Sequence, residues 1–119
     1  MLLSDVKTVI NADVLTGESD EELSEKNIHT AFGSDLMSDV LAFVKDQSLL
    51  LTGLINSQVV RTAEMMDILA VCFVRGKTPT EDVVELAKEK GITLLRTELT
   101  LYNASGRLYE KGLGGTSDG

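Results

Sequence analysis

The sequence predicts a single α/β domain, a three-layer structure in which helices flank a mixed, mostly parallel sheet. Three observations lead to this prediction. The chain has 119 residues, which suits one domain with one core. Segments with a helical spacing of apolar residues alternate with short apolar runs, and this alternation is typical of α/β layers. The run at 68–74 (ILAVCFV) carries no polar side chain, as expected of a strand covered on both faces.

The first third of the chain predicts one helix and two short strands. Apolar residues recur at helical spacing over 2–10, and Asp5 lies near the start, where an acidic side chain suits the helix dipole. Short strands are expected over 12–17 and 26–34, and one of them can pair antiparallel with the rest. Residues 18–25 (ESDEELSE) show no apolar face, so we expect a solvated loop there.

The middle third predicts two further helices and a central strand. Ser34 suits the N-cap of a helix over 34–46, and a buried strand is expected over 48–55, closed by a loop at Asn56. A second helix over 57–67 leads into the apolar run described above. The side chains expected to face inward from these helices are Leu36, Met37, Val40, Leu41 and Val44, and then Val59, Val60, Ala63 and Met66.

The last third continues the alternation with a helix over 81–91, a strand over 92–98 and a helix over 99–112. Thr80 is expected to cap the first of these helices. Gly91 is expected to end it, because glycine readily adopts the left-handed conformation found at helix C-termini.

The end of the chain combines an aromatic stripe with a polar tail. Tyr102 and Tyr109 lie seven residues apart, and therefore on one face of the last helix together with Leu99. This stripe fits either the core or a contact between two copies, because small α/β domains often bury an apolar face against a copy. The final LGGTSDG has nothing to bury, so we expect a domain over 1–112 and a flexible C-terminal tail over 113–119.

The composition argues against several classes of partner. The formal net charge is −8 and the sequence pI is about 4.5, which opposes binding to nucleic acid and docking on an anionic membrane surface. The longest apolar runs are too short to span a bilayer, and the first residues lack a signal-peptide pattern. Cys72 is the single cysteine, so no intramolecular disulfide can form. We expect a cytoplasmic protein.

The turn at 74–81 (VRGKTPTE) is the candidate for phosphate binding, because it joins an apolar strand to a helix. It has one glycine and the pair Lys77 and Thr78, but it lacks the spacing of a P-loop. Pro79 also removes a backbone donor close to the helix start. The turn therefore fails as a P-loop, although a helix N-terminus beside Arg75 can still attract an anion.

Loops that follow parallel strands meet at one edge of a sheet, and ligands bind at that edge. We therefore predict that this turn lies near the loop after 26–34 and the loop after 48–55. The residues that would form a ligand site there are Gly33, Ser34, Asp35, Gly53, Asn56, Arg75, Gly76, Lys77 and Thr78. A ligand at this edge would be an anion or a nucleotide. The simpler prediction, which we favour, is that the turn is only a connection.

No residue pattern predicts a catalytic, metal or cofactor site. His29 is the only histidine, and neither triad partners nor metal ligands appear at recognisable spacing around it. Cys72 lies in the most apolar strand, where a buried thiol is inert. One alternative is a small phosphate-handling enzyme in which Asp35 and Asp39 hold magnesium beside a basic residue of the turn.

Two segments resemble the DRTGG domain family, and the resemblance covers nearly the whole chain. GSDLMSDVLA at 33–42 looks like the family's Ser-Asp-Leu-Leu-Ser-Asp-Val segment. CFVRGKTPTEDVVELAKEKGITLLRTE at 72–98 is similar to its strand, Thr-Gly-Gly turn, proline-containing helix start and Gly-Ile exit. Where the family carries Thr-Gly-Gly, this chain has Val74, Arg75 and Gly76, so that only the last glycine remains.

The resemblance implies a regulatory rather than a catalytic module. Such domains lie between the CBS domains of nucleotide-regulated pyrophosphatases and in some long phosphotransacetylases. They are also similar in fold to the N-terminal domain of HPr kinase/phosphorylase, but this chain has no kinase P-loop. We expect a non-catalytic homodimer without a cofactor, for which an adenine nucleotide or another anion is the implied ligand. The alternative is an accessory subunit that binds a larger metabolic or redox enzyme.

Overall fold

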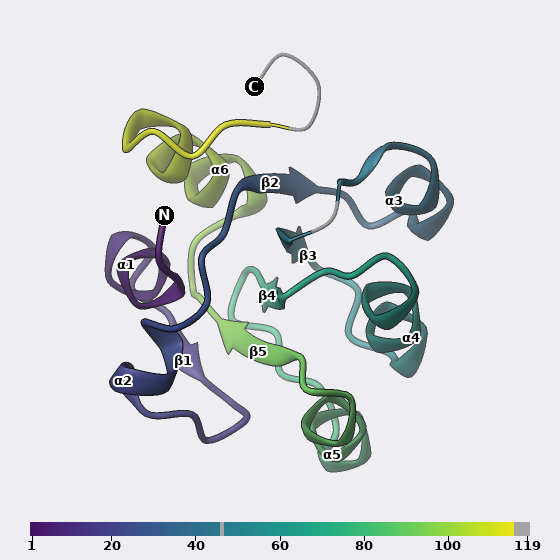
Figure 1. Cartoon of the computed structure of the whole chain (residues 1–119). Helices are drawn as coiled ribbons and strands as arrows, with labels where there is room; N and C mark the ends of the chain where they lie inside the picture. Colours follow the sequence, from purple (N-terminus) through teal and green to yellow (C-terminus); the bar gives the residue numbers. More distant parts are fainter. Residues whose placement is uncertain (46, 116–119) are drawn as a thin grey trace.

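A mixed sheet forms the centre of the domain (Figure 1). The computed structural model describes residues 1–45 and 47–115, and within them five strands pair in the order β1-β5-β4-β3-β2. The strands are β1 (Asp13–Val14), β2 (Thr30–Gly33), β3 (Ser48–Thr52), β4 (Ala70–Phe73) and β5 (Thr93–Arg96). Strands β2 to β5 are parallel, whereas β1 pairs antiparallel with β5. The predicted mixed, mostly parallel sheet is confirmed.

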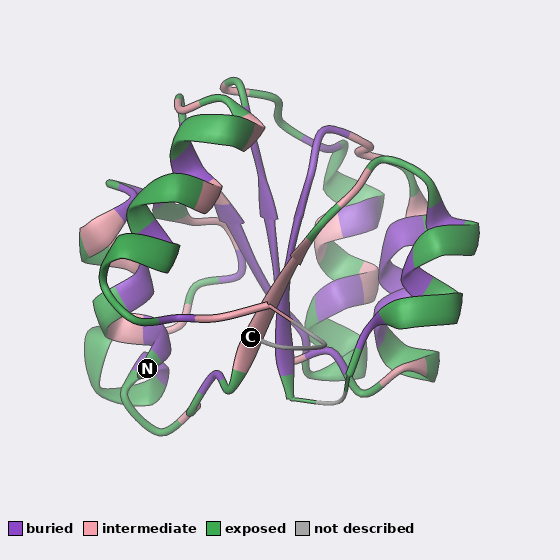
Figure 2. Cartoon of the chain, turned by 90° about the horizontal axis from the view of Figure 1, so that it is seen from above, coloured by how far each residue is buried: buried purple, intermediate pink, exposed green. Residues whose placement is uncertain are grey.

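Helices cover both faces of this sheet (Figures 1 and 2). They are α1 (Leu3–Val9), α2 (Asp20–Leu23), α3 (Met37–Phe43), α4 (Ser57–Met65), α5 (Glu81–Lys90) and α6 (Leu101–Glu110). The helices α3, α4 and α5 join successive parallel neighbours, so right-handed crossovers place all three on one face. The other face carries α1, α2 and α6. None of the described helices is long and apolar enough to cross a bilayer.

The two faces of the sheet support two separate apolar clusters. Leu50, Phe73 and Leu94 pack against the α3–α5 layer, whereas Leu49 and Leu95 pack against α1, α2 and α6. Every residue of β3 and β4 is buried, which is the reason for the unbroken apolar sequence of β4 and for the three leucines at the centre of β3 (Figure 2). The predicted three-layer domain is therefore confirmed.

The loop predicted over 18–25 is wrong, because a short helix forms inside it. Ser19 and Glu22 form a capping box: the Glu22 amide donates to Ser19 Oγ at 3.2 Å, and the Ser19 amide donates to Glu22 Oε1 at 3.0 Å. The helix buries Leu23 completely in the α1 and α6 layer. A single apolar side chain produces no periodicity, so the Ser19–Glu22 capping-box spacing was the signal that could have revealed this helix.

The predicted helix boundaries are correct at one helix and wrong at another. Helix α5 has Thr80 at its N-cap and Gly91 at its C-terminus, with a left-handed φ of 72° at the glycine. Ser34, in contrast, does not cap α3, which begins at Met37. Its Oγ instead accepts from the amide of Leu36 at 2.9 Å and shapes the loop before the helix.

The packed structure extends past residue 112, where the domain was predicted to end, into the predicted tail over 113–119. Leu113 is only 4% exposed and packs in the same cluster as Leu108. The carbonyl oxygen of Gly114 accepts a hydrogen bond from the Ala31 amide at 3.0 Å, so this segment lies beside the edge strand β2. The remainder of the predicted tail, 116–119, lies outside the described residues.

Candidate functional site

The loops that follow β2, β3 and β4 meet at the C-terminal edge of the sheet. Asp35 Oδ1 accepts from the Gly53 amide at 2.6 Å and from Thr52 Oγ1 at 3.1 Å. A Cβ atom added to Gly53 would lie 2.9 Å from Arg75 Nη2 and 3.3 Å from Asp35 Oδ2. The loops therefore converge as a parallel sheet requires, and a larger residue at 53 would have to displace the end of the Arg75 side chain.

The backbone donors of residues 75–77, in the turn after β4, already have partners inside the chain. The Arg75 amide donates to the Leu99 carbonyl at 2.8 Å, and the Gly76 amide donates to the Thr97 carbonyl at 2.8 Å. The Lys77 amide donates within its own turn at 3.3 Å. Phosphate-binding turns need such amides to point at the ligand, so this turn offers an anion little beyond its side chains.

The loop after β5 holds the same turn from the other side. Gly76 has a left-handed φ of 67°, and a Cβ there would collide with the Glu98 carboxylate. Arg96 joins the two segments, because its Nε donates to the Gly76 carbonyl at 3.0 Å and its Nη2 pairs with Glu98 at 3.0 Å. The carboxylate beside Gly76 adds negative charge where an anion would have to approach.

The exposed cations at this edge are Arg75 and Lys77. Neither takes part in the ion pairs found among the described residues. Thr78 is also exposed. Glu81 and Asp82 follow in the first turn of α5, where they already complement the positive end of the helix dipole. The edge therefore combines two free cations with nearby acidic side chains.

Three of the predicted site residues are engaged elsewhere. Asn56 Oδ1 caps α4 by accepting from the Gln58 amide at 3.1 Å, and Ser34 shapes the loop before α3. Gly33 lies against α6, where an added Cβ would be 2.9 Å from Leu101 Cδ1. The structure therefore brings Asp35 and Gly53 together with the Arg75 turn, but gives the other three different local roles.

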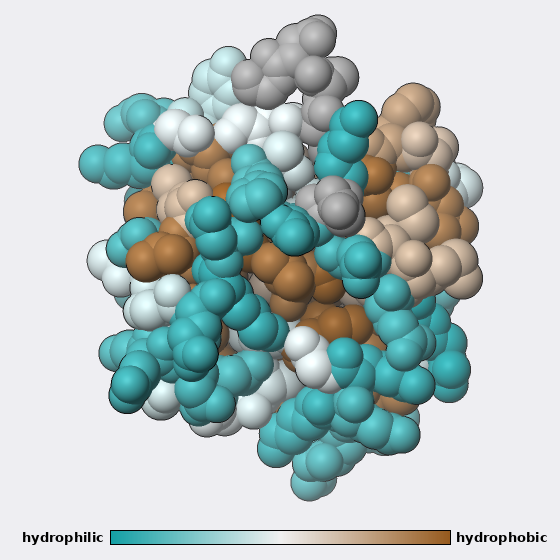
Figure 3. All heavy atoms as spheres, in the orientation of Figure 1, coloured by the Kyte–Doolittle hydropathy of each residue, from teal (hydrophilic) through white to brown (hydrophobic). Residues whose placement is uncertain are grey.

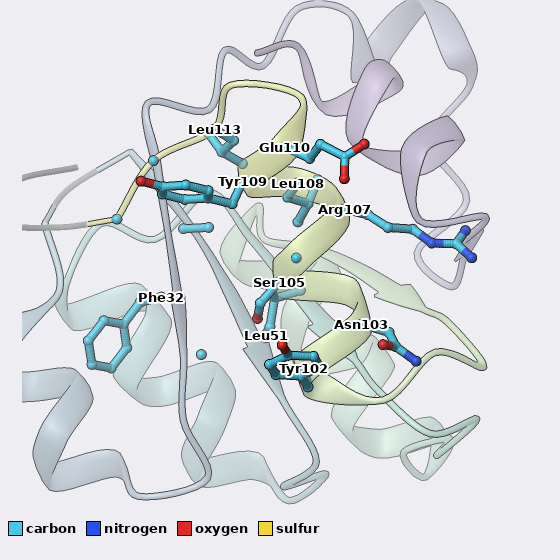
Figure 4. A pocket seen from close by; sticks show the side chains of 15 residues that line it. Phe32, Leu51, Tyr102, Asn103, Ser105, Arg107, Leu108, Tyr109, Glu110 and Leu113 are labelled. Carbon is cyan, nitrogen blue, oxygen red and sulfur yellow. The ribbon is translucent and has the colours of Figure 1, made fainter.

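An open groove of about 740 Å³ lies between α6, β2 and the segment at 113–115 (Figure 4). Its lining includes Tyr102 and Tyr109, whose exposed fractions are 86% and 70%. The aromatic stripe of α6 is therefore not core, which removes one of its two predicted roles. The spacing of the tyrosines indicated a shared face, but the groove depends on a segment that was predicted to be a free tail.

Side chains that could carry nucleophilic or metal chemistry are few. Among residues 1–45 and 47–115, no group of three or more His, Cys, Asp or Glu side chains could hold a metal ion. Cys72 is fully buried, and this burial raises the pKa of its thiol to about 12. Asp35 and Arg75 both approach Gly53, but Oδ1 of Asp35 is occupied by loop hydrogen bonds.

A polar network ties the segment before α2 to the start of β5. Thr93 Oγ1 donates to Glu18 Oε2 at 2.5 Å, and Lys26 Nζ donates to Thr93 Oγ1 at 2.8 Å and to the Gly91 carbonyl at 3.1 Å. Burial favours the neutral carboxyl of Glu18, but hydrogen bonds from Thr16 and Thr93 outweigh it and lower the pKa. Burial lowers the pKa of Lys26. These partners satisfy one another, as expected of a structural network.

A comparison with solved structures supports the fold. The chain is similar to the crystal structure of the CBS and DRTGG domains of the regulatory region of Clostridium perfringens pyrophosphatase, complexed with its activator diadenosine tetraphosphate. The TM-score is 0.67 at 16% sequence identity, and the match covers 90% of this chain but 45% of the other. This likeness concerns the fold alone. A search of curated proteins found no match.

The family model of the DRTGG domain matches residues 5–110. This range includes all the helices and strands described above, apart from the first two residues of α1. Both segments that resemble the family, at 33–42 and 72–98, lie within this match. The chain therefore belongs to the DRTGG domain family.

Proposed function

We propose that this DRTGG domain is a non-catalytic regulatory or interaction module that works as a homodimer. Exposed apolar surface carries the proposal. The large hydrophobic side chains exposed among the described residues are Leu2, Leu36, Leu41, Phe43, Met65, Tyr102 and Tyr109. Most of them belong to α3, its N-cap or α6, the helices on either side of the edge strand β2 (Figure 1). Apolar patches of this kind mark protein contacts in small domains.

Two observations favour a regulatory role over a catalytic one. The similar solved DRTGG domain belongs to the regulatory region of an enzyme rather than to its catalytic part. In this chain, the single cysteine is buried with a raised thiol pKa, and His29 is exposed on the loop before β2. A module of this kind acts by contacting other chains.

For the loop edge, we propose a connecting role rather than nucleotide binding. The solved neighbour was crystallised with diadenosine tetraphosphate, which makes an adenine nucleotide the ligand class to consider. Arg75 and Lys77 would supply charge to such a ligand. The amides of the turn donate to carbonyls of the same chain, however, and Glu98 lies against Gly76. Any nucleotide would therefore bind weakly through side chains alone.

Light scattering coupled to size exclusion, at micromolar concentration, tests the homodimer. The expected particle has twice the 12.9 kDa mass of the chain. A particle of single-chain mass at every concentration would exclude the homodimer. The purified chain should not hydrolyse nucleotides or phosphate esters. A hydrolytic activity that a single substitution in this chain abolishes would contradict the non-catalytic assignment.

A second candidate, an accessory subunit of a larger enzyme, is favoured by the surface of α3. Leu36, Leu41 and Phe43 are 57%, 44% and 60% exposed, although Leu36 and Leu41 were predicted to face inward. Figure 3 shows this apolar surface over α3. A pull-down from the source cell tests the accessory-subunit proposal with two variants of the chain as baits, one changed on α6 and one on α3. A partner should be retained by Tyr102→Glu, on α6, and lost from Phe43→Ser, on α3.

A further inference from the structure

Helix α6 carries two apolar stripes, and the sheet uses only one of them. The inner stripe packs on the sheet layer and consists of Leu101, Ala104 and Leu108. The outer stripe, formed by Tyr102, Ser105, Gly106 and Tyr109, lines the groove beside β2. A surface helix of a monomer normally buries one stripe and presents polar residues elsewhere. The second stripe is therefore available for contact with another chain.

The outer stripe has large side chains at its ends and small ones at its centre. Tyr102 and Tyr109 lie about 10.5 Å apart along the helix axis, given the rise of 1.5 Å per residue. Both point to the same side of α6 (Figure 4). A Cβ added at Gly106 would meet nothing within 4 Å, so the helix surface is open at its centre.

This arrangement is complementary to itself. A two-fold axis between Ser105 and Gly106 pairs each tyrosine of one helix with the other tyrosine of an antiparallel copy, Tyr102 opposite Tyr109 of the partner subunit. The same axis places small residues opposite small residues, so the two helices can approach closely. We infer that the homodimer proposed above, on which this inference rests, forms through antiparallel contact of the two α6 helices.

The charges of the groove favour a second copy over an anionic ligand. Among the described residues, the charged side chains that line it are Arg107 and Glu110, which cancel, whereas the whole chain carries a net charge of −8. Two strongly acidic chains can therefore meet at this face without bringing further like charges together. The rings of Tyr102 and Tyr109 would fill the ends of the groove and exclude water.

Pairing of two β2 strands explains the groove less well. The Ala31 amide already donates to the Gly114 carbonyl at 3.0 Å, so the segment at 113–115 occupies part of the free edge of β2. A second strand would have to displace that segment and expose Leu113, which is now 4% exposed. The α6 contact leaves this packing intact and uses the segment as one wall of the groove.

Tyr102→Glu and Tyr109→Glu in the full chain test the interface by sedimentation equilibrium. Each places a carboxylate in the predicted contact, and each should raise the dimer Kd by about tenfold or more. The matched control is Phe43→Glu, a similarly exposed aromatic residue on α3, which should leave Kd unchanged. Because all three side chains are exposed, the circular dichroism spectra should not change.

The possible results separate this inference from the proposed homodimer. A wild-type chain that never dimerises excludes both. A dimer that survives both tyrosine changes, or that Phe43→Glu weakens as much, excludes the α6 interface and leaves the homodimer standing.

Cysteine cross-linking provides a test that does not depend on disrupting the dimer. Mild oxidation of Gly106→Cys should produce a disulfide-linked dimer, because the axis brings the two positions together. Glu85→Cys, at an exposed position on α5 that does not line the groove, should remain uncross-linked. The native Cys72 is fully buried and should not interfere. Equal cross-linking of the two variants would overturn the α6 interface.

Discussion

The carboxylate of Asp35 accepts a hydrogen bond from the main-chain amide of Gly53, with 2.6 Å between Oδ1 and the nitrogen. The same oxygen accepts from the Thr52 hydroxyl at 3.1 Å. This contact ties the loop after β2 to the loop after β3. It also places the protein's own carboxylate on the Gly53 amide, so this donor is occupied by an internal contact.

Replacing Asp35 should therefore destabilise the fold. Asp35→Ala leaves the Gly53 amide without its acceptor, and the free energy of unfolding should fall by about 1–3 kcal/mol. Asp35→Asn is the matched control, because its amide oxygen can still accept and the loss should be smaller. Urea denaturation compares the two variants. Equal losses would mean that the charge, rather than the acceptor, holds the loops.

The two left-handed glycines around α5 should respond differently to alanine. Gly91→Ala meets open space, so its cost is that of the left-handed backbone alone, about 1 kcal/mol. Gly76→Ala must also displace the Glu98 carboxylate from Arg96, which adds up to about 1 kcal/mol. Urea denaturation should show that Gly76→Ala loses more unfolding free energy than Gly91→Ala. This excess loss should disappear in a Glu98→Ala background. An excess that remains there would exclude Glu98 as its cause.

Acid should remove the stabilising contribution of Glu18. Its pKa in the folded chain is lowered from an ordinary value of 4.5, so folding favours the ionised carboxylate. The contribution is present above pH 4.5 and is lost as the pH falls through the lowered pKa. Wild type should therefore be more stable than Glu18→Gln at neutral pH, and the difference in unfolding free energy should shrink below pH 4.5. A difference that is constant with pH would contradict this account.

Adenine nucleotides should leave the turn after β4 unperturbed. The amides of Arg75 and Gly76 donate to carbonyls of the same chain, so these two amides are not open to a phosphate. Titration with ATP, followed by amide NMR shifts, should show no change over 75–80 at millimolar ligand. The double variant Arg75→Ala and Lys77→Ala is the control for attraction by charge alone. Shifts that saturate in wild type and vanish in this variant would establish an anion site.

Much of the architecture follows from local patterns. The unbroken apolar run around Val71 indicated a strand covered on both faces, and both of its faces are covered. The left-handed C-terminus of α5 at Gly91 followed from the conformational freedom of glycine. Alternation of helix and strand also predicted that the loops of Asp35, Gly53 and Arg75 would meet, because parallel strands deliver their following loops to one edge.

Contacts between distant segments decided the rest. The Arg75 amide is satisfied by Leu99, far along the chain, and no local pattern reports such a pairing. Likewise, Tyr102 and Tyr109 have a spacing that fits core or surface equally well. Only the placement of α6 over β2 shows which stripe of the helix is buried, and leaves both tyrosines exposed. Periodicity identifies which side chains share a face, whereas tertiary packing determines what that face contacts.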